Sequence, residues 1–275
     1  MNNLNIIFLV ENLVKTRGYL GEHGLSLYLE SGENKFLFDT GQGNCLMPNI
    51  KKMGFSLKDL SAVILSHGHY DHTGGLKKLL KEAPSLPVMS HPRVLERKFK
   101  KGKEGYEYIG LEEDKEGFTG RANWVFNREP VEIARNIFLT GEIPPGKEEG
   151  EKDFYLKSNC NYHPDPFRDE QALFINTRAG VIVITGCAHM GVINTLDYVH
   201  HLTGNMPVAL LGGTHLLNAG ENILYETLER IKERDIKYLG VCHCTGLDSY
   251  GYLKRKLPHR VFYQETGSIF NLSKL

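Results

Sequence analysis

The sequence predicts a layered α/β fold, because of its strand and helix patterns and the positions of its polar clusters. In the second half of the chain, short apolar runs typical of strands alternate with stretches typical of helices. This alternation is characteristic of α/β layers. Each of the three strand candidates there ends in a polar cluster that contains a histidine. Since ligands in such folds gather beyond the carboxyl ends of strands, we expect a functional site at that edge.

The first third of the chain is expected to form antiparallel strands followed by a strand, a loop and a helix. Strand-like runs bounded by turn signals cover residues 4–10, 24–30 and 35–39. The apolar run 60–65 then ends abruptly in a cluster of histidines, and a helical stretch follows over about 73–82. A polar loop thus connects a buried strand to the start of a helix.

The rest of the chain is expected to belong to the same single domain, 1–275. Further strands are predicted at 86–90, 131–140, 173–185, 208–211 and 238–241, with helices at 192–202 and 222–233. Two stretches rich in charge and aromatics, near 93–120 and 144–168, are expected to be loop excursions over the surface. Long loops inside compact domains are commonly functional lids or disordered.

Composition excludes several classes of protein. The chain has 275 residues, 41% of them hydrophobic, and 33 basic side chains balance 33 acidic ones, which argues against disorder and against general attraction to nucleic acid or anionic membranes. Five scattered cysteines, an odd number, fit a reduced compartment. Without a secretory pattern or an apolar run of membrane-spanning length, we expect a soluble, cytoplasmic protein. The sequence carries no signal for an oligomeric state.

The segment Ser-His-Gly-His-Tyr-Asp-His-Thr-Gly-Gly at 66–75 carries the chemistry. Three imidazoles and a carboxylate within six residues are donors that zinc, iron, manganese or nickel use. His67 and His69, two apart in an extended loop, can project toward one metal, and Asp71 and His72 can turn toward a second. A dinuclear site is therefore geometrically reasonable. The alternative, histidines that only cap the helix, does not account for so dense a set.

This motif, with Phe-Leu-Phe-Asp-Thr-Gly at 36–41 before it, resembles the metallo-β-lactamase fold superfamily, and the resemblance spans nearly the whole chain. It implies a four-layered αββα sandwich with a one- or two-metal site between its sheets. The segments EHGLSLYLE, ITGCAHMG, LLGGTHL and CHCTG are similar to a narrower subgroup. That subgroup comprises 7,8-dihydropterin-6-methyl-4-(β-D-ribofuranosyl)-aminobenzene-5′-phosphate synthases, usually described as metal-dependent hydrolases.

The resemblance also implies a ligand set. In the family, one metal takes the two leading histidines and a third from a later strand end, and the other takes the Asp-His pair and a final histidine. Carried over, the metal ligands are His67, His69 and His189 for the first ion, and Asp71, His72 and His243 for the second. Asp71 would also be the catalytic proton acceptor. Two divalent ions are expected, with zinc favoured and iron or manganese as alternatives.

The chain departs from the family pattern where most members read Thr-Gly-Asp. Cys187 stands in place of that bridging carboxylate, where it either bridges as a thiolate or fills a small apolar space, and we favour the second role. No histidine precedes Asp169 at the usual third-ligand place, so His189 takes that role. Asp169 remains a second candidate, which could ligate or fix a histidine tautomer. Asp39 and His215 are candidates for contacts with metal ligands or substrate, although a structural role for His215 is equally open.

These features together predict a metal-dependent hydrolase. It would act on a small anionic metabolite, phosphorylated or pterin-like, through a metal-activated water. The alternative is a di-iron redox or metal-binding protein on the same fold without hydrolytic turnover. RNA processing is disfavoured because the chain has zero net charge and no evident basic exosite. We therefore expect neither a nucleic-acid nor a membrane partner.

Overall fold

A computed structural model describes residues 4–112, 120, 122–146 and 153–271. Its first sheet has the strand order β18-β1-β2-β3-β4-β5-β8. These strands are Leu4–Val10 (β1), Ser26–Ser31 (β2), Asn34–Phe38 (β3), Ala62–Ile64 (β4), Pro87–Ser90 (β5), Asn123–Phe126 (β8) and Ile269–Asn271 (β18).

The second sheet has the order β17-β16-β15-β14-β13-β10-β9. Its strands are Val131–Ala134 (β9), Ile137–Leu139 (β10), Leu173–Thr177 (β13), Gly180–Thr185 (β14), Pro207–Gly212 (β15), Tyr238–Val241 (β16) and Val261–Tyr263 (β17). The strands β14, β15, β16 and β17 run parallel to one another, so their carboxyl ends meet at one edge.

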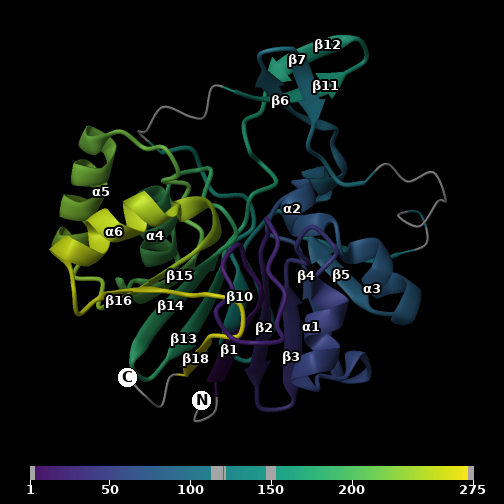
Figure 1. The fold of residues 1–275 in the computed structure, drawn as a ribbon, viewed down its shortest axis with the longest axis horizontal. Coiled ribbons are helices and arrows are strands. Elements are labelled where there is room, and N and C mark those ends of the chain that lie inside the picture. Colours follow the sequence, from purple (N-terminus) through teal and green to yellow (C-terminus); the bar gives the residue numbers. More distant parts are fainter. Residues whose placement is uncertain (1–3, 113–119, 121, 147–152, 272–275) are drawn as a thin grey trace.

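Helices cover the outer face of each sheet (Figure 1). They are Leu46–Met53 (α1), Leu76–Glu82 (α3), Val192–Thr203 (α4), Glu221–Glu233 (α5) and Leu247–Lys256 (α6), whereas the short helix Tyr70–Thr73 (α2) lies at the upper edge of the sandwich in this view. One buried cluster joins α1 and α3 to the first sheet, and another joins α4, α5 and α6 to the second. The predicted four-layered αββα sandwich is therefore confirmed. In the part of the chain described, no helix is both long and apolar enough to cross a membrane.

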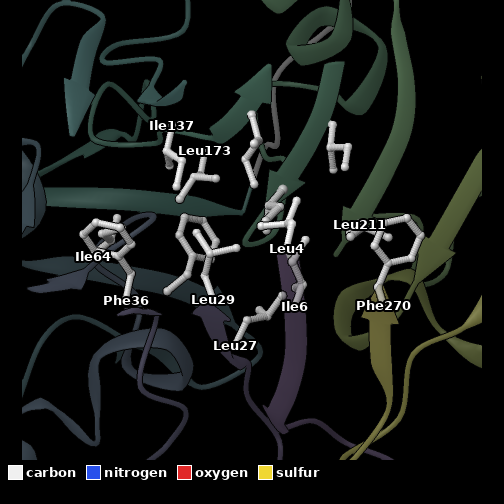
Figure 2. Close-up of a cluster of buried hydrophobic side chains, with 14 of the residues drawn as sticks. Leu4, Ile6, Leu27, Leu29, Phe36, Ile64, Ile137, Leu173, Leu211 and Phe270 are labelled. Carbon is white, nitrogen blue, oxygen red and sulfur yellow. The ribbon is translucent and has the colours of Figure 1, made fainter. Parts of the chain in front are cut away.

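The two sheets pack face to face over an apolar core, in which side chains such as Phe36 and Leu173 approach from opposite sides (Figure 2). The sequence of strand β14 is apolar at successive positions because both faces of the strand are buried. Ile182 and Ile184 belong to the core between the sheets, whereas Val181 and Val183 pack beneath the helices. A parallel strand buried on both faces reads as a continuous hydrophobic run.

The two stretches expected to be loop excursions contain strands instead. Lys98–Gly102 (β6), Gly105–Tyr108 (β7), Phe154–Ser158 (β11) and Asn161–Pro164 (β12) form a third sheet in the order β12-β11-β6-β7. It stands at the top of the sandwich in Figure 1. The sequence did not reveal it because β6 pairs with β11, a partner more than fifty residues away. Residues 113–119 and 147–152 of these stretches lie outside the described part.

Two further boundaries differ from the prediction. The expected strand 131–140 is a hairpin of β9 and β10, which turns at Asn136 in the left-handed conformation. The expected helix 73–82 divides into α2 and α3 at Gly74 and Gly75. A Cβ at Gly75 would lie 2.3 Å from the Thr40 carbonyl oxygen. The glycine pair thus lets this segment pack directly on the chain that leaves β3.

Candidate metal centre

Three separate segments of the chain bring the six predicted metal ligands to one edge of the sandwich. His67 and His69 lie in the loop after β4, and Asp71 and His72 lie on α2. The turn after β14 supplies His189, and the turn after β16 supplies His243, which are the two ligands taken from later strand ends. All six side chains are buried.

The first group consists of His67, His69 and His189, which each offer a nitrogen within 4.8 Å of the others. The Nε2 atom of His69 and both ring nitrogens of His189 are buried without a hydrogen-bond partner. A buried polar atom left unpaired is costly, so these nitrogens indicate a bound group. Burial, reinforced by the neighbouring histidines, holds the pKa of all three well below the usual range. They are therefore neutral, the form that binds a metal.

The second group consists of Asp71, His72 and His243. Asp71 Oδ2 lies 3.3 Å from His243 Nε2 and 3.9 Å from His72 Nε2, and the two Nε2 atoms are 3.2 Å apart. Burial opposes ionisation of Asp71, but the charge of His72 and hydrogen bonds with His23 and His243 outweigh it and hold the carboxyl pKa well below its usual range. One ionised carboxylate and two imidazoles fit a divalent ion.

Contacts behind the histidines fix their ring orientation. Asp39 Oδ2 is 2.7 Å from His72 Nδ1, and Asn12 Oδ1 is 2.9 Å from His243 Nδ1. The backbone N–H of His243 donates to Glu11 Oε1 at 2.6 Å. Partners of this kind select which nitrogen faces a metal. The sequence indicated Asp39 but not Glu11 or Asn12, although two polar residues directly after the apolar strand β1 were an available signal.

Asp169 and Glu170 position the backbone around the first group. Asp169 Oδ2 accepts the Gly68 N–H at 2.7 Å, and its Oδ1 accepts Lys98 Nζ at 2.8 Å. Asp169 therefore holds the histidine loop directly, through the Gly68 main chain, and its other oxygen pairs with Lys98. The carboxylate of Glu170 accepts the N–H groups of His189 and Met190, each at 2.7 Å. Burial raises the pKa of Glu170 to about 7 against these hydrogen bonds. Glu170 is not among the predicted site residues.

Strained backbone accompanies the site. Asp39, Ala188, His215 and His243 all have positive φ, at 62°, 63°, 52° and 51°. Such left-handed non-glycine residues cost on the order of 1–3 kcal/mol each and cluster at functional sites. Three of the four lie in the turns that follow β14, β15 and β16. The same turns carry His189, His215 and His243, so the strain coincides with the placement of these side chains.

Cys187 and His215 lie beside the two groups. Cys187 Sγ is 3.1 Å from His72 Nε2 and within 4.8 Å of a His67 nitrogen. The sulfur thus faces ring nitrogens of two predicted metal ligands. The rings of His215 and His189 lie 4.2 Å apart. His23, which is outside the predicted ligand set, places Nε2 3.2 Å from Asp71 Oδ2.

A cavity of about 460 Å³ opens onto both groups. Asp71, His189 and His243 lie in its wall, together with Lys100 and Phe154 of the third sheet. The Phe154 ring stacks on His69 with centroids 5.3 Å apart. A second cavity of about 710 Å³ adjoins it and shares His189 as a lining residue. The third sheet therefore forms part of the wall around the candidate centre.

Comparison with known proteins agrees with this architecture. The chain is 31% identical over 267 residues to the 7,8-dihydropterin-6-methyl-4-(beta-D-ribofuranosyl)-aminobenzene-5'-phosphate synthase of Methanocaldococcus jannaschii, covering 90% of this chain and 89% of the relative. A crystal structure of a metal-dependent hydrolase of the beta-lactamase superfamily superposes with a TM-score of 0.86 at 29% identity, over 97% of this chain and 98% of that one.

Zn(2+)-bound PqqB from Methylobacterium extorquens shares the fold, with a TM-score of 0.59 at 15% identity, over 98% of this chain and 100% of that one. The family model described as the metallo-beta-lactamase superfamily matches residues 20–243. That match covers the histidine loop and every predicted metal ligand. The chain therefore belongs to the metallo-beta-lactamase superfamily.

Proposed function

We propose that this chain is a hydrolase with two divalent metal ions, zinc favoured, that acts on a small anionic metabolite. The observation that carries the proposal is the convergence of six buried donors into two adjacent groups, in which His69 Nε2 and both ring nitrogens of His189 lack a hydrogen-bond partner. His67, His69 and His189 would hold one ion. Asp71, His72 and His243 would hold the other. Bound ions of this kind lower the pKa of a water molecule and neutralise charge on the reacting oxygens.

Asp71 is the proton acceptor in this proposal. Its carboxylate lines the cavity and stays ionised, so it can take up a proton released during hydrolysis. His23 Nε2 lies 3.2 Å from Asp71 Oδ2, and about half of the His23 side chain is exposed. Asp71 and His23 thus offer a short path from the cavity to solvent.

The cavity wall supports an anionic substrate with a flat ring. Lys100 lines the cavity and places Nζ 5.5 Å from the centre of the Phe154 ring. An ammonium group beside aromatic surface suits a phosphorylated, ring-bearing metabolite. The name of the relative from Methanocaldococcus jannaschii, which combines a dihydropterin with a 5'-phosphate, supports the same substrate class.

The first experiment is metal analysis of untagged protein by elemental mass spectrometry. We expect at least two ions per chain in the wild type and fewer in His69→Ala and His189→Ala. His163→Ala, on the exposed strand β12, is the matched control and should keep the full content. No metal under replete conditions would refute the proposal.

Activity is then assayed on a panel of phosphoesters, pyrophosphates and lactones. Turnover by the metal-loaded wild type, lost in His69→Ala, would support the hydrolase. Since the same donors bind iron, the competing redox function predicts visible absorption in the purified protein without turnover on this panel. That result would refute the hydrolytic function while leaving the metal centre intact.

A further inference from the structure

A second cluster of metal-binding side chains lies next to the histidine centre. Cys187, His215 and Cys244 follow the three parallel neighbours β14, β15 and β16, one from each strand end. Their donor atoms, two sulfurs and a ring nitrogen, all lie within 4.8 Å of one another. The two cysteines are 4% and 7% exposed, and His215 is partly buried. All three residues line the 460 Å³ cavity.

The turns that carry these side chains are held tightly together. The His215 N–H donates to Cys244 Sγ at 3.3 Å, and Cys244 Sγ lies 3.4 Å from the Cys187 carbonyl oxygen. The hydroxyl groups of Thr214 and Thr245 are hydrogen-bonded at 2.9 Å. A Cβ at Gly213 would lie 2.5 Å from Cys244 Sγ, so this approach requires glycine. The donors are thus positioned before any ion binds.

We propose that Cys187, His215 and Cys244 form a third metal position, suited to a thiophilic divalent ion such as Zn²⁺. Two thiolates and one imidazole are a known zinc donor set, and three protein ligands leave a fourth position open. Binding displaces the two thiol protons to solvent, because only the thiolate ligates. Since the cluster lines the cavity, the open position is available to a substrate anion.

Cys187 connects this position to the histidine centre. Its sulfur is 3.1 Å from His72 Nε2 and belongs to two donor groups, one with His67 and His72 and one with His215 and Cys244. A thiolate can ligate two ions at once, so Cys187 can serve both positions. The competing explanation is that Cys187 serves the histidine centre alone. The two explanations differ in whether metal binding depends on Cys244.

Titration with Co²⁺ distinguishes a third metal position from a Cys187 that serves the histidine centre alone. Cobalt–thiolate bonds give a charge-transfer absorption that cobalt–imidazole bonds do not. Every protein carries Cys160→Ser to remove the exposed thiol. We expect about three Co²⁺ ions per chain with a strong thiolate band, and about two ions with at most half that band in Cys244→Ala. His215→Ala should lose the same ion. Cys242→Ala, a buried thiol of the apolar core two residues away, is the matched control and should resemble the parent.

Circular dichroism verifies that each variant folds, and His215→Ala provides the second test if Cys244→Ala does not. An unchanged stoichiometry and a full thiolate band in both variants would overturn the third position. The absence of any thiolate band in the parent would overturn it as well. His69→Ala tests the histidine centre separately, since loss of ions there should leave a band that still depends on Cys244. Failure of one site is thereby distinguishable from failure of the other.

Discussion

Asp39 Oδ2 lies 2.7 Å from His72 Nδ1 and accepts a second hydrogen bond from Ser66 Oγ at 2.7 Å. This contact turns His72 Nε2 toward Asp71 and His243. Removing such a partner costs roughly 10- to 100-fold in metal affinity. We expect that loss in Asp39→Asn, measured by competition with a chromophoric chelator. Asp59→Asn, an exposed carboxylate paired with Lys35, should bind metal like the wild type, and equal affinities in both variants would contradict the role of Asp39.

Lys98 is a buried cation on which the histidine loop depends. Its Nζ lies 2.7 Å from Asp165 Oδ2 and 2.8 Å from Asp169 Oδ1, and the side chain is 1% exposed. Lys98→Met would leave two buried carboxylates without a counter-charge, at a cost of about 3–5 kcal/mol. We therefore expect a much lower urea midpoint. Lys101→Met, on an exposed position of the same strand, should change stability by no more than about 0.5 kcal/mol. Similar midpoints for both would show that the ion pairs contribute little.

Local patterns predicted the α/β layers and a site at the strand ends, and the resemblance of the histidine motif to a known family implied the four-layered sandwich. Apolar runs marked β1, β14 and β15, and the histidine loop follows β4 as expected. What the sequence could not predict depends on distant pairing. The third sheet joins β6 to β11, and the support of His243 comes from Glu11 and Asn12 at the other end of the chain. Such contacts leave no periodic signal in a single sequence.

Alanine substitutions at two glycines test the close packing, because we expect them to change the stability of the protein in opposite directions. A Cβ at Gly75 would lie 2.3 Å from the Thr40 carbonyl oxygen, so we expect Gly75→Ala to destabilise the protein by about 1–3 kcal/mol. Gly251 lies inside α6, and a Cβ there would meet only Arg255 Nη1, at 3.6 Å. Gly251→Ala should stabilise the helix by about 0.5–1 kcal/mol. Urea unfolding measures both, and changes of the same sign would contradict this account of Gly75.

A substitution at His189 tests whether a residue needed for metal binding destabilises the metal-free protein. Its ring stacks on Phe167 at 4.4 Å with an interplanar angle of 5°, and Phe154 lies 5.2 Å away. Both ring nitrogens are buried without a hydrogen-bond partner, so without metal they destabilise the fold. Phenylalanine would keep the aromatic packing and remove these atoms. We therefore expect the free energy of unfolding of metal-free His189→Phe to equal that of the metal-free wild type or to exceed it by up to about 1 kcal/mol.

The same variant should lose the response to metal. In the wild type a chelator should lower the melting temperature, because an ion that binds only the folded state stabilises it. His189→Phe should show a much smaller shift and bind fewer ions, since the first group keeps only His67 and His69. His163→Phe, on the exposed strand β12, should retain the full shift. An undiminished shift in His189→Phe would mean that its unpaired nitrogens hold no ion, and the first position would then lack its third ligand.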